Sequence, residues 1–302
     1  MFWLTVRQYR MQLIVTAAVL AAIGVVLLVH SITTRNAMAG LSGDALDQVV
    51  GDRVALMHSL VTWLPAAPAL VGLFWGAPLV AREIENGTHL LAWTQSVPRR
   101  RWLAVKVAVL AGAVTLCGLA LGAIVTGWVG TFEGTPFAYK FSDYGIFAVS
   151  GVAAAGWWLF AFMLGTAAGA LTRKLLPALV VTLAVFFVAV FVLFQLRENY
   201  AEPERIVAPA AQAATAQDAD AMPVESNWVG PDGKEIAGAV EGCDGDASTY
   251  LACVQGKGYK GVTYVQPPDR YWRFQWTEAG ILAAAAVLLG GVAYQRVSRR
   301  AL

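Results

Sequence analysis

Six long apolar runs constrain the fold of this chain more than any other feature. Each run is continuously apolar, as in LPALVVTLAVFFVAVFVLF at residues 176–194. A helix crosses a bilayer with about 20 apolar residues, whereas barrel strands alternate over about 10 residues. The sequence therefore predicts an all-α membrane protein with six transmembrane helices. We expect these spans at about 11–30, 58–81, 106–129, 145–171, 175–195 and 276–295.

The composition and the charge distribution agree with this prediction and give it an orientation. Charged residues make up 14% of the chain, against about 25% in soluble domains. The N-terminus, residues 82–106, the turn at 172–174 and the tail at 296–302 hold 12 of the 22 Lys and Arg residues. The same segments hold 2 of the 20 Asp and Glu residues, so the opposite side keeps 10 basic and 18 acidic residues. The positive-inside rule then places both termini in the cytoplasm.

Two segments outside the runs have features of their own. Residues 1–10 place Trp3 beside Arg7 and Arg10, which predicts a short helix on the cytoplasmic interface. Residues 196–275 predict an extracellular loop between spans five and six. Its first part, 201–225, is rich in Ala, Pro and acidic residues, and we expect it to be poorly packed. Its second part has enough aromatic residues for a small domain that caps the outer face.

Cysteine and glycine spacing leave two alternatives each. Cys243 and Cys253 lie in the extracellular loop, where a pair normally forms a disulfide; the alternative is two free thiols. No metal site is predicted, because the three histidines lie elsewhere. Glycines at 118 and 122, and again at 165 and 169, allow helices to approach closely. This spacing fits either a seam between two copies or packing within one chain.

Several chemistries lack the residues that they require. No ionisable residue lies in the middle of a predicted span, since Lys106 and Glu278 lie at span ends. Ion-coupled carriers usually need such a residue. The chain also has no phosphate-binding GxxxxGK[ST] loop and no catalytic pair for intramembrane hydrolysis. An energy source inside the chain is therefore not predicted.

The polar segment at 82–102 lies between spans two and three. Asn86-Gly87 is a turn signal, and residues 88–95 can form a short helix that ends at Ser96-Val97-Pro98. The pattern allows a helical finger under the membrane. On the pattern alone, however, a solvated loop whose basic triplet needs no partner is favoured.

The stretch AREIENGTHLLAWTQSVPRRRWLAVK, residues 81–106, resembles the loop between spans two and three of type-2 ABC (ABC-2) exporter permeases of the kind found in high-GC bacteria. Stretches at 74–83, 161–186 and 264–280 add to the resemblance. The matching positions in the loop are Glu85, Gly87, Thr88, Leu91, Ser96, Pro98, Arg99 and Lys106.

The resemblance implies a multi-pass half-transporter in the bacterial cytoplasmic membrane. A second copy of the chain, or a related permease, would complete it, and separately encoded ABC ATPase subunits would bind ATP and Mg. The chain itself would hold no cofactor and would bind no nucleic acid. In the family the segment docks on the ATPase. The residues that carry this coupling role would be Glu83, Glu85, Gly87, Thr88, Leu91, Ser96 and Pro98.

The remaining expectations concern the transport path and its surroundings. Arg7, Arg10, Arg99, Arg100 and Arg101 are expected to contact lipid headgroups. ATP binding would switch a cavity between two copies from inward to outward access, and the cargo would be hydrophobic or amphipathic. Candidate gate residues are Phe186, Phe187 and Phe191 in span five. An alternative function is a membrane sensor or immunity protein that binds a ligand through its extracellular loop.

Overall fold

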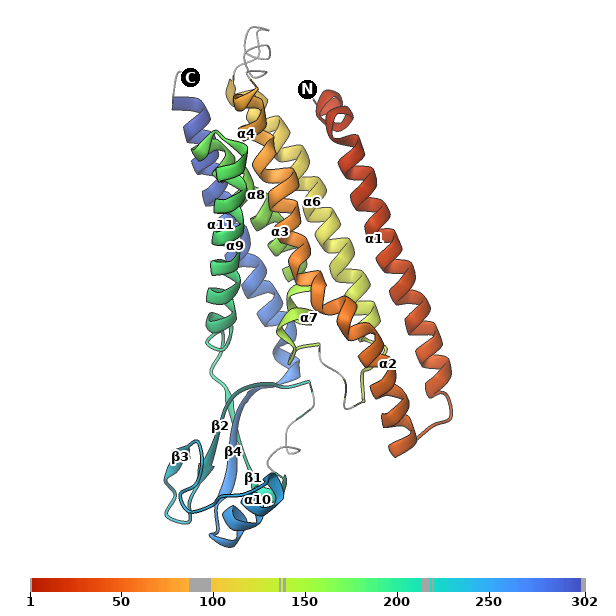
Figure 1. The fold of residues 1–302 in the computed structure, drawn as a ribbon, viewed down its shortest axis with the longest axis vertical. Coiled ribbons are helices and arrows are strands. Elements are labelled where there is room, and N and C mark those ends of the chain that lie inside the picture. The colour runs from red at the N-terminus through yellow and green to blue at the C-terminus, as the bar shows by residue number, and fades with distance from the viewer. Residues whose placement is uncertain are drawn as a thin grey trace.

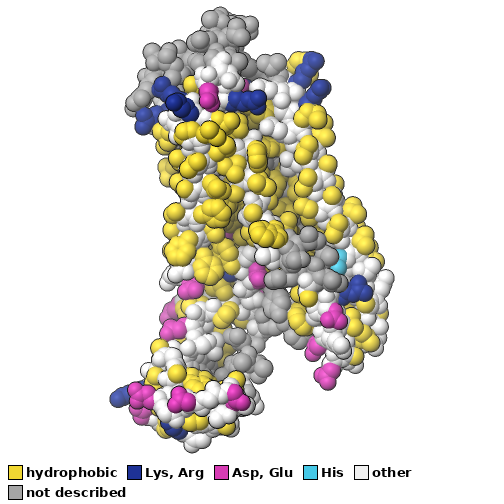
Figure 2. Space-filling model, viewed as in Figure 1, with side chains coloured by type: hydrophobic (Ala, Val, Ile, Leu, Met, Phe, Trp, Pro, Cys, Tyr) yellow, Lys and Arg dark blue, Asp and Glu magenta, His cyan; other side chains and the backbone are white. Residues whose placement is uncertain are grey.

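The computed structural model describes residues 2–86, 99–135, 137, 140–212, 218 and 220–299. Figure 1 shows a tall helical bundle with a small unit of strands and one helix at one end. Both termini lie at the opposite end. We call the end with the termini the basic end and the end with the strands the acidic end, after the charges that Figure 2 shows there.

The described residues contain six helical segments that are long and apolar enough to cross a membrane, as predicted. These segments are Arg7–Met38, Val61–Glu85, Arg101–Val129, Ala153–Thr172, Leu175–Arg197 and Pro268–Ser298. They belong to helices α1 (Phe2–Met38), α2–α4, α6 (Arg99–Val129), α8 (Ala153–Thr172), α9 (Leu175–Arg197) and α11 (Tyr271–Arg299).

Span two is built from several pieces in sequence. Helix α2 (Asp44–Trp63) leads through a 3-10 turn (Leu64–Ala66) into α3 (Ala67–Val71). A π-helical turn, η2 (Gly72–Gly76), then joins α3 to α4 (Ala77–Glu85). Such π-turns are rare and are frequent at functional sites.

Two predicted elements differ in the structure. The expected N-terminal interfacial helix at 1–10 is not a separate element, because residues 2–10 continue α1 without a break. No proline interrupts α1, so nothing ends a helix after Arg10. The predicted span at 145–171 is divided into α7 (Tyr144–Val149) and α8, and the chain bends at Ser150 and at Gly151, whose φ is +54°.

Helix α8 forms the centre of the bundle and is almost entirely buried. A Cβ atom on Gly72 would lie 2.7 Å from the carbonyl oxygen of Ala161, and one on Gly169 would lie 2.6 Å from that of Ala77. On the other side, a Cβ atom on Gly118 would lie 2.7 Å from the Cα of Ala155. The small residues therefore bring spans within one chain into backbone contact, which supports packing within one chain over a seam.

The unit at the acidic end makes the fold more than all-α. Strands β1 (Glu204–Pro209), β2 (Met222–Val229), β3 (Glu235–Ala237) and β4 (Lys260–Gln266) form an antiparallel sheet in the order β1-β4-β2-β3. Helix α10 (Ala247–Gly256) packs beside it. The expectation of a poorly packed 201–225 segment is wrong for its ends, because β1 and β2 both begin there and pair with β4.

Candidate functional site

The basic end carries the start of the segment that was singled out in the sequence. Figure 2 shows Lys and Arg side chains gathered at this end, with one acidic side chain visible among them. Arg7, Arg10, Arg82 and Arg101 are exposed there. Helix α4 ends within this segment, at Glu85, so the connection of the segment to the bundle depends on the acidic residues of the last turn of α4.

Glu83 attaches α4 to spans one and three. Its carboxylate forms an ion pair with the ammonium group of Lys106 on α6. Gln8 of α1 also donates a hydrogen bond to the same carboxylate, with 3.3 Å between Nε2 and Oε1. The side chains of Lys106 and Glu83 are 7% and 16% exposed. Lys106 further stacks on the ring of Trp102, with Nζ 4.7 Å from the ring centroid.

Glu85 attaches the same helix to span five. Its Oε2 atom accepts a hydrogen bond of 3.1 Å from the backbone N–H of Leu175, the first residue of α9. The first N–H groups of a helix have no partner inside the helix, and Lys174 at the N-cap supplies no side-chain bond. Glu85 therefore caps α9 from another span. Two residues of a helix differ by about 200° in direction, so Glu83 and Glu85 can face different neighbours.

The structure thus joins α1, α4, α6 and α9 through two carboxylates that the sequence analysis assigned to the ATPase contact. Both make intramolecular bonds. We call Gln8, Glu83, Glu85, Lys106 and the Leu175 N–H the anchor cluster. The cluster is suited to transmit displacement of the 82–98 segment into three other spans.

Several predicted site residues lie outside this description. Gly87, Thr88, Leu91, Ser96 and Pro98 lie outside the described residues. Arg99 and Arg100 begin α6, but their side chains lie outside the description as well. Arg7, Arg10 and Arg101 are exposed, so contact with lipid headgroups stays a prediction.

The three phenylalanines predicted as a gate differ in burial, although the rings of Phe186 and Phe187 lie edge to face with centroids 6.3 Å apart. Phe186 is buried and packs edge-on against Trp157 of α8, with ring centroids 5.6 Å apart. Phe187 and Phe191 lie on the outer face of α9 and are 61% and 66% exposed. Phe186 therefore contributes to the packing of one chain, and a gating role for the other two stays a prediction.

Sequence reasoning missed a buried charged cluster toward the acidic end. Glu278 of α11 is fully buried, and its Oε1 atom accepts a hydrogen bond of 2.8 Å from Trp157 Nε1. Arg197, the last residue of α9, is also buried and lies over the ring of Phe147 at 4.2 Å. Its Nη2 atom donates to the carbonyl oxygen of Phe141 at 3.2 Å.

The same face of α11 closes the gap between α7 and α8. Gln275 accepts a hydrogen bond from the N–H of Ala153 and donates one to the carbonyl oxygen of Phe147. The hydroxyl groups of Tyr271 and Ser150 lie 2.8 Å apart. Tyr271, Gln275 and Glu278 follow the four- and three-residue spacing of one helix face, and this polar stripe is the sequence signal that could have revealed the cluster.

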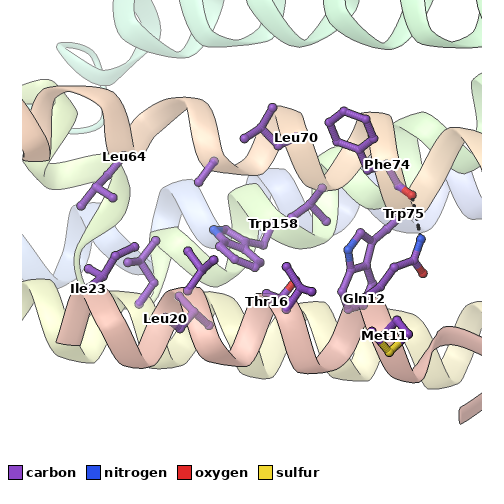
Figure 3. Close-up of a pocket in the computed structure, with 15 residues that line it drawn as sticks. Met11, Gln12, Thr16, Leu20, Ile23, Leu64, Leu70, Phe74, Trp75 and Trp158 are labelled. Carbon is purple, nitrogen blue, oxygen red and sulfur yellow. Dashed lines mark hydrogen bonds between the residues drawn. The ribbon is translucent and has the colours of Figure 1, made fainter. Parts of the chain in front are cut away.

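A cavity of about 420 Å³ lies between span one and span two (Figure 3). Helices α1, α3 and η2 form its sides, and Leu121 of α6 and Trp158 of α8 also line it. Gln12 bridges one end, where its Nε2 atom donates to the carbonyl oxygen of Phe74 at 3.2 Å. Among the residues that the structure describes, no charged side chain lines the cavity. The space is therefore suited to an uncharged ligand.

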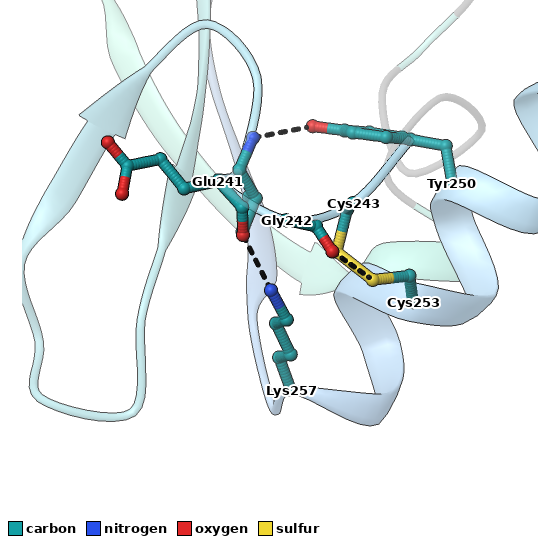
Figure 4. Close-up of a disulfide and its surroundings, with 7 residues drawn as sticks. Glu241, Gly242, Cys243, Tyr250, Cys253 and Lys257 are labelled. Atoms are coloured by element: carbon teal, nitrogen blue, oxygen red, sulfur yellow. Dashed lines mark hydrogen bonds between the residues drawn. A yellow bond between two sulfur atoms is a disulfide. The ribbon is translucent and has the colours of Figure 1, made fainter. Parts of the chain in front are cut away.

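The unit at the acidic end contains the predicted disulfide (Figure 4). Cys243 and Cys253 are bonded, with 5.6 Å between their Cα atoms, and they join the segment after β3 to α10. Tyr250 accepts a hydrogen bond from the N–H of Val240, and Lys257 donates one to the carbonyl oxygen of Glu241. Over the part of the chain that the structure describes, no group of His, Cys, Asp and Glu side chains is arranged to hold a metal ion.

Comparison with known proteins gives one family. The model of a family described as "ABC-2 membrane transporter related" matches residues 5–197, which is more than half of the chain. No curated protein and no solved structure matches the chain.

Proposed function

The chain belongs to the ABC-2 membrane transporter related family, and from this premise we propose that it is the permease subunit of an ATP-driven exporter. Family membership and the apolar helices make it an integral membrane protein of the transporter-permease type. The proposal adds the ATPase as the partner subunit and the outward direction of transport. A separately encoded ABC ATPase would dock on residues 82–98, and cargo would move outward through a complex of two permease copies.

The anchor cluster is the observation that carries this proposal. An external ATPase can do work on the bundle only if its two states bind the coupling segment differently and if the segment is connected to the spans. Glu83 connects it to α1 and α6, and Glu85 connects it to the start of α9. A solvated loop without a partner would not require these connections.

The charge distribution supports the orientation within the proposal. Basic side chains lie at the end with both termini, and acidic side chains lie on and near the sheet. The positive-inside rule assigns the basic end to the cytoplasm, in this proposal on the inner side of a bacterial cytoplasmic membrane. The ATPase site and the anchor cluster would then share one side, while the disulfide would lie on the oxidising side.

Site-specific photo-crosslinking tests the proposal. A benzophenone amino acid replaces Leu91 in the coupling segment, and in a control chain it replaces Ile236, which is exposed on β3 at the opposite end. We expect light to join the first chain, but not the second, to a subunit whose peptides contain a phosphate-binding loop. A ligand captured at Ile236 with no ATPase at Leu91 would instead support the sensor or immunity alternative.

A further inference from the structure

The cavity between span one and span two has a polar atom that the fold leaves unpaired. Trp158 is 4% exposed, and its Nε1–H has no hydrogen-bond partner among the described residues. Figure 3 places its indole between α1 and the helix that carries Leu64 and Leu70. Burying an unpaired donor is unfavourable, so an acceptor that reaches this nitrogen would be favoured.

A second unpaired atom lies at the end where Gln12 bridges the two spans. The amide of Gln12 uses its nitrogen to bind the carbonyl oxygen of Phe74, while its buried Oε1 atom has no partner among the residues described. This oxygen can accept a hydrogen bond from a donor group of a ligand. The cavity thus has one unpaired donor and one unpaired acceptor buried in its wall, and apart from Thr16 and Trp75 the other side chains that line it are apolar.

The shape of the cavity favours a chain-like molecule. Its lining on α1 extends from Met11 to Ile23, which corresponds to roughly 18 Å of helix at about 1.5 Å per residue. The volume of about 420 Å³ lies within the range of about 300–1,000 Å³ that small-molecule sites occupy. Val15, Val19 and Leu70 of its rim are exposed, so a molecule could enter from the side.

We propose that this cavity binds one neutral, elongated, mostly apolar molecule with a hydrogen-bond acceptor partway along its length. The acceptor pairs with Trp158 Nε1, and a hydroxyl group near one end donates to Gln12 Oε1. A helix of a second copy is a poorer occupant, since its carbonyl groups are used within the helix and cannot reach an indole in the wall. The site lies within one chain, so it does not depend on the ATPase or on the proposed export.

Photolabelling of the purified permease, without any ATPase, tests the inference. The probe is a long-chain primary alcohol that carries a diazirine in mid-chain. We expect adducts on the peptides that contain residues 11–23 and 64–75. Ala67→Phe, which fills the cavity, should abolish them, whereas Leu176→Phe on the exposed face of α9 should not.

The hydrogen bond is tested separately with a variant that lacks the indole N–H. Two competitors are used, a long-chain methyl ester with a mid-chain keto group and the same ester without it. The keto ester should compete about five- to tenfold better, in line with one hydrogen bond in a dry site. Trp158→Phe should remove this preference, and Trp63→Phe, at an exposed tryptophan outside the cavity, should keep it.

The lipid competition identifies the source of the ligand, and the variants decide for or against the site. Competition by a neutral membrane lipid such as diacylglycerol would identify a resident lipid as the ligand, and its failure would leave a cargo-like molecule; both agree with the inference. Unchanged labelling in Ala67→Phe, or no keto preference in the parent chain, would overturn it. So would a cysteine crosslink between two copies through Val15 and Phe74 in a preparation that takes up no probe.

Discussion

The ammonium group of Lys106 and the carboxylate of Glu83 form an ion pair between α6 and α4, and both groups are largely shielded from solvent. Removing one partner of such a pair leaves an uncompensated charge. We expect Glu83→Gln to destabilise the protein by about 3 kcal/mol, near the lower limit for buried pairs because Glu83 keeps some exposure. The thermal midpoint of the purified protein measures this. Arg101→Gln, which removes an exposed charge near the same end of α6, should leave the midpoint within error.

Glu85 should matter through its acceptor oxygen rather than through its charge. Glu85→Ala removes the bond to the Leu175 N–H, whereas Glu85→Gln keeps an oxygen that can accept it. We expect the alanine variant to lose most of the stimulation of the partner ATPase and the glutamine variant to retain it. Equal loss in both variants would assign Glu85 to a charge contact with the ATPase instead.

Arg197 and Glu278 should behave as an electrostatic pair, although no direct bond joins them in the structure. Both side chains are buried, Arg197 at the last residue of α9 and Glu278 in the first part of α11. Each would lose charge compensation if the other were neutralised. Arg197→Met and Glu278→Gln should each lower the thermal midpoint. The double variant should lose less than the two single losses combined, with a coupling of about 1–3 kcal/mol. Strict additivity would show that the two side chains act independently.

The anchor cluster and this charged pair show which part of the molecule the sequence could predict. The six spans follow from local runs of apolar residues, and the structure confirms them. The partners of Glu83, Glu85 and Glu278 come from other spans, up to 121 residues away along the chain, so no local pattern identifies them. Gly151 permits the break between α7 and α8, yet this break also depends on Gln275 in span six.

The disulfide should contribute to the stability of the sheet unit and not to that of the bundle. It closes a short loop, with a sequence separation of 10, which predicts about 3 kcal/mol in the chain-entropy model. We expect Cys243→Ser with Cys253→Ser to increase cleavage within residues 226–270 by added protease. Cys117→Ser, in span three, is the matched control and should leave the cleavage pattern unchanged. Mass mapping with and without reductant verifies the bond.

Asp220 should give the acidic end a measurable dependence on pH. Its Oδ1 atom accepts a 2.6 Å hydrogen bond from the N–H of Phe141, and burial raises the pKa of this carboxyl. A raised pKa in the folded state means that its contribution is complete below the unfolded pKa and is lost as the pH rises through the folded pKa.

An amide at this position keeps the acceptor and removes the titration. Asp220→Asn should therefore be more stable than the parent near neutral pH, and the difference should shrink toward about pH 4. Thermal midpoints across this range measure the effect, with the exposed Asp269→Asn as control. A constant difference at every pH would show that ionisation of Asp220 is not its cause.

Strand β4 lies between β1 and β2, and only four residues separate its end from the start of α11. Arg270 in this short link is bonded to Gln266 of β4 and to Glu204 of β1. These bonds couple the sheet to the start of the last span. An antibody fragment that binds the sheet could therefore inhibit movement of the last span from outside the membrane, without blocking a transport path.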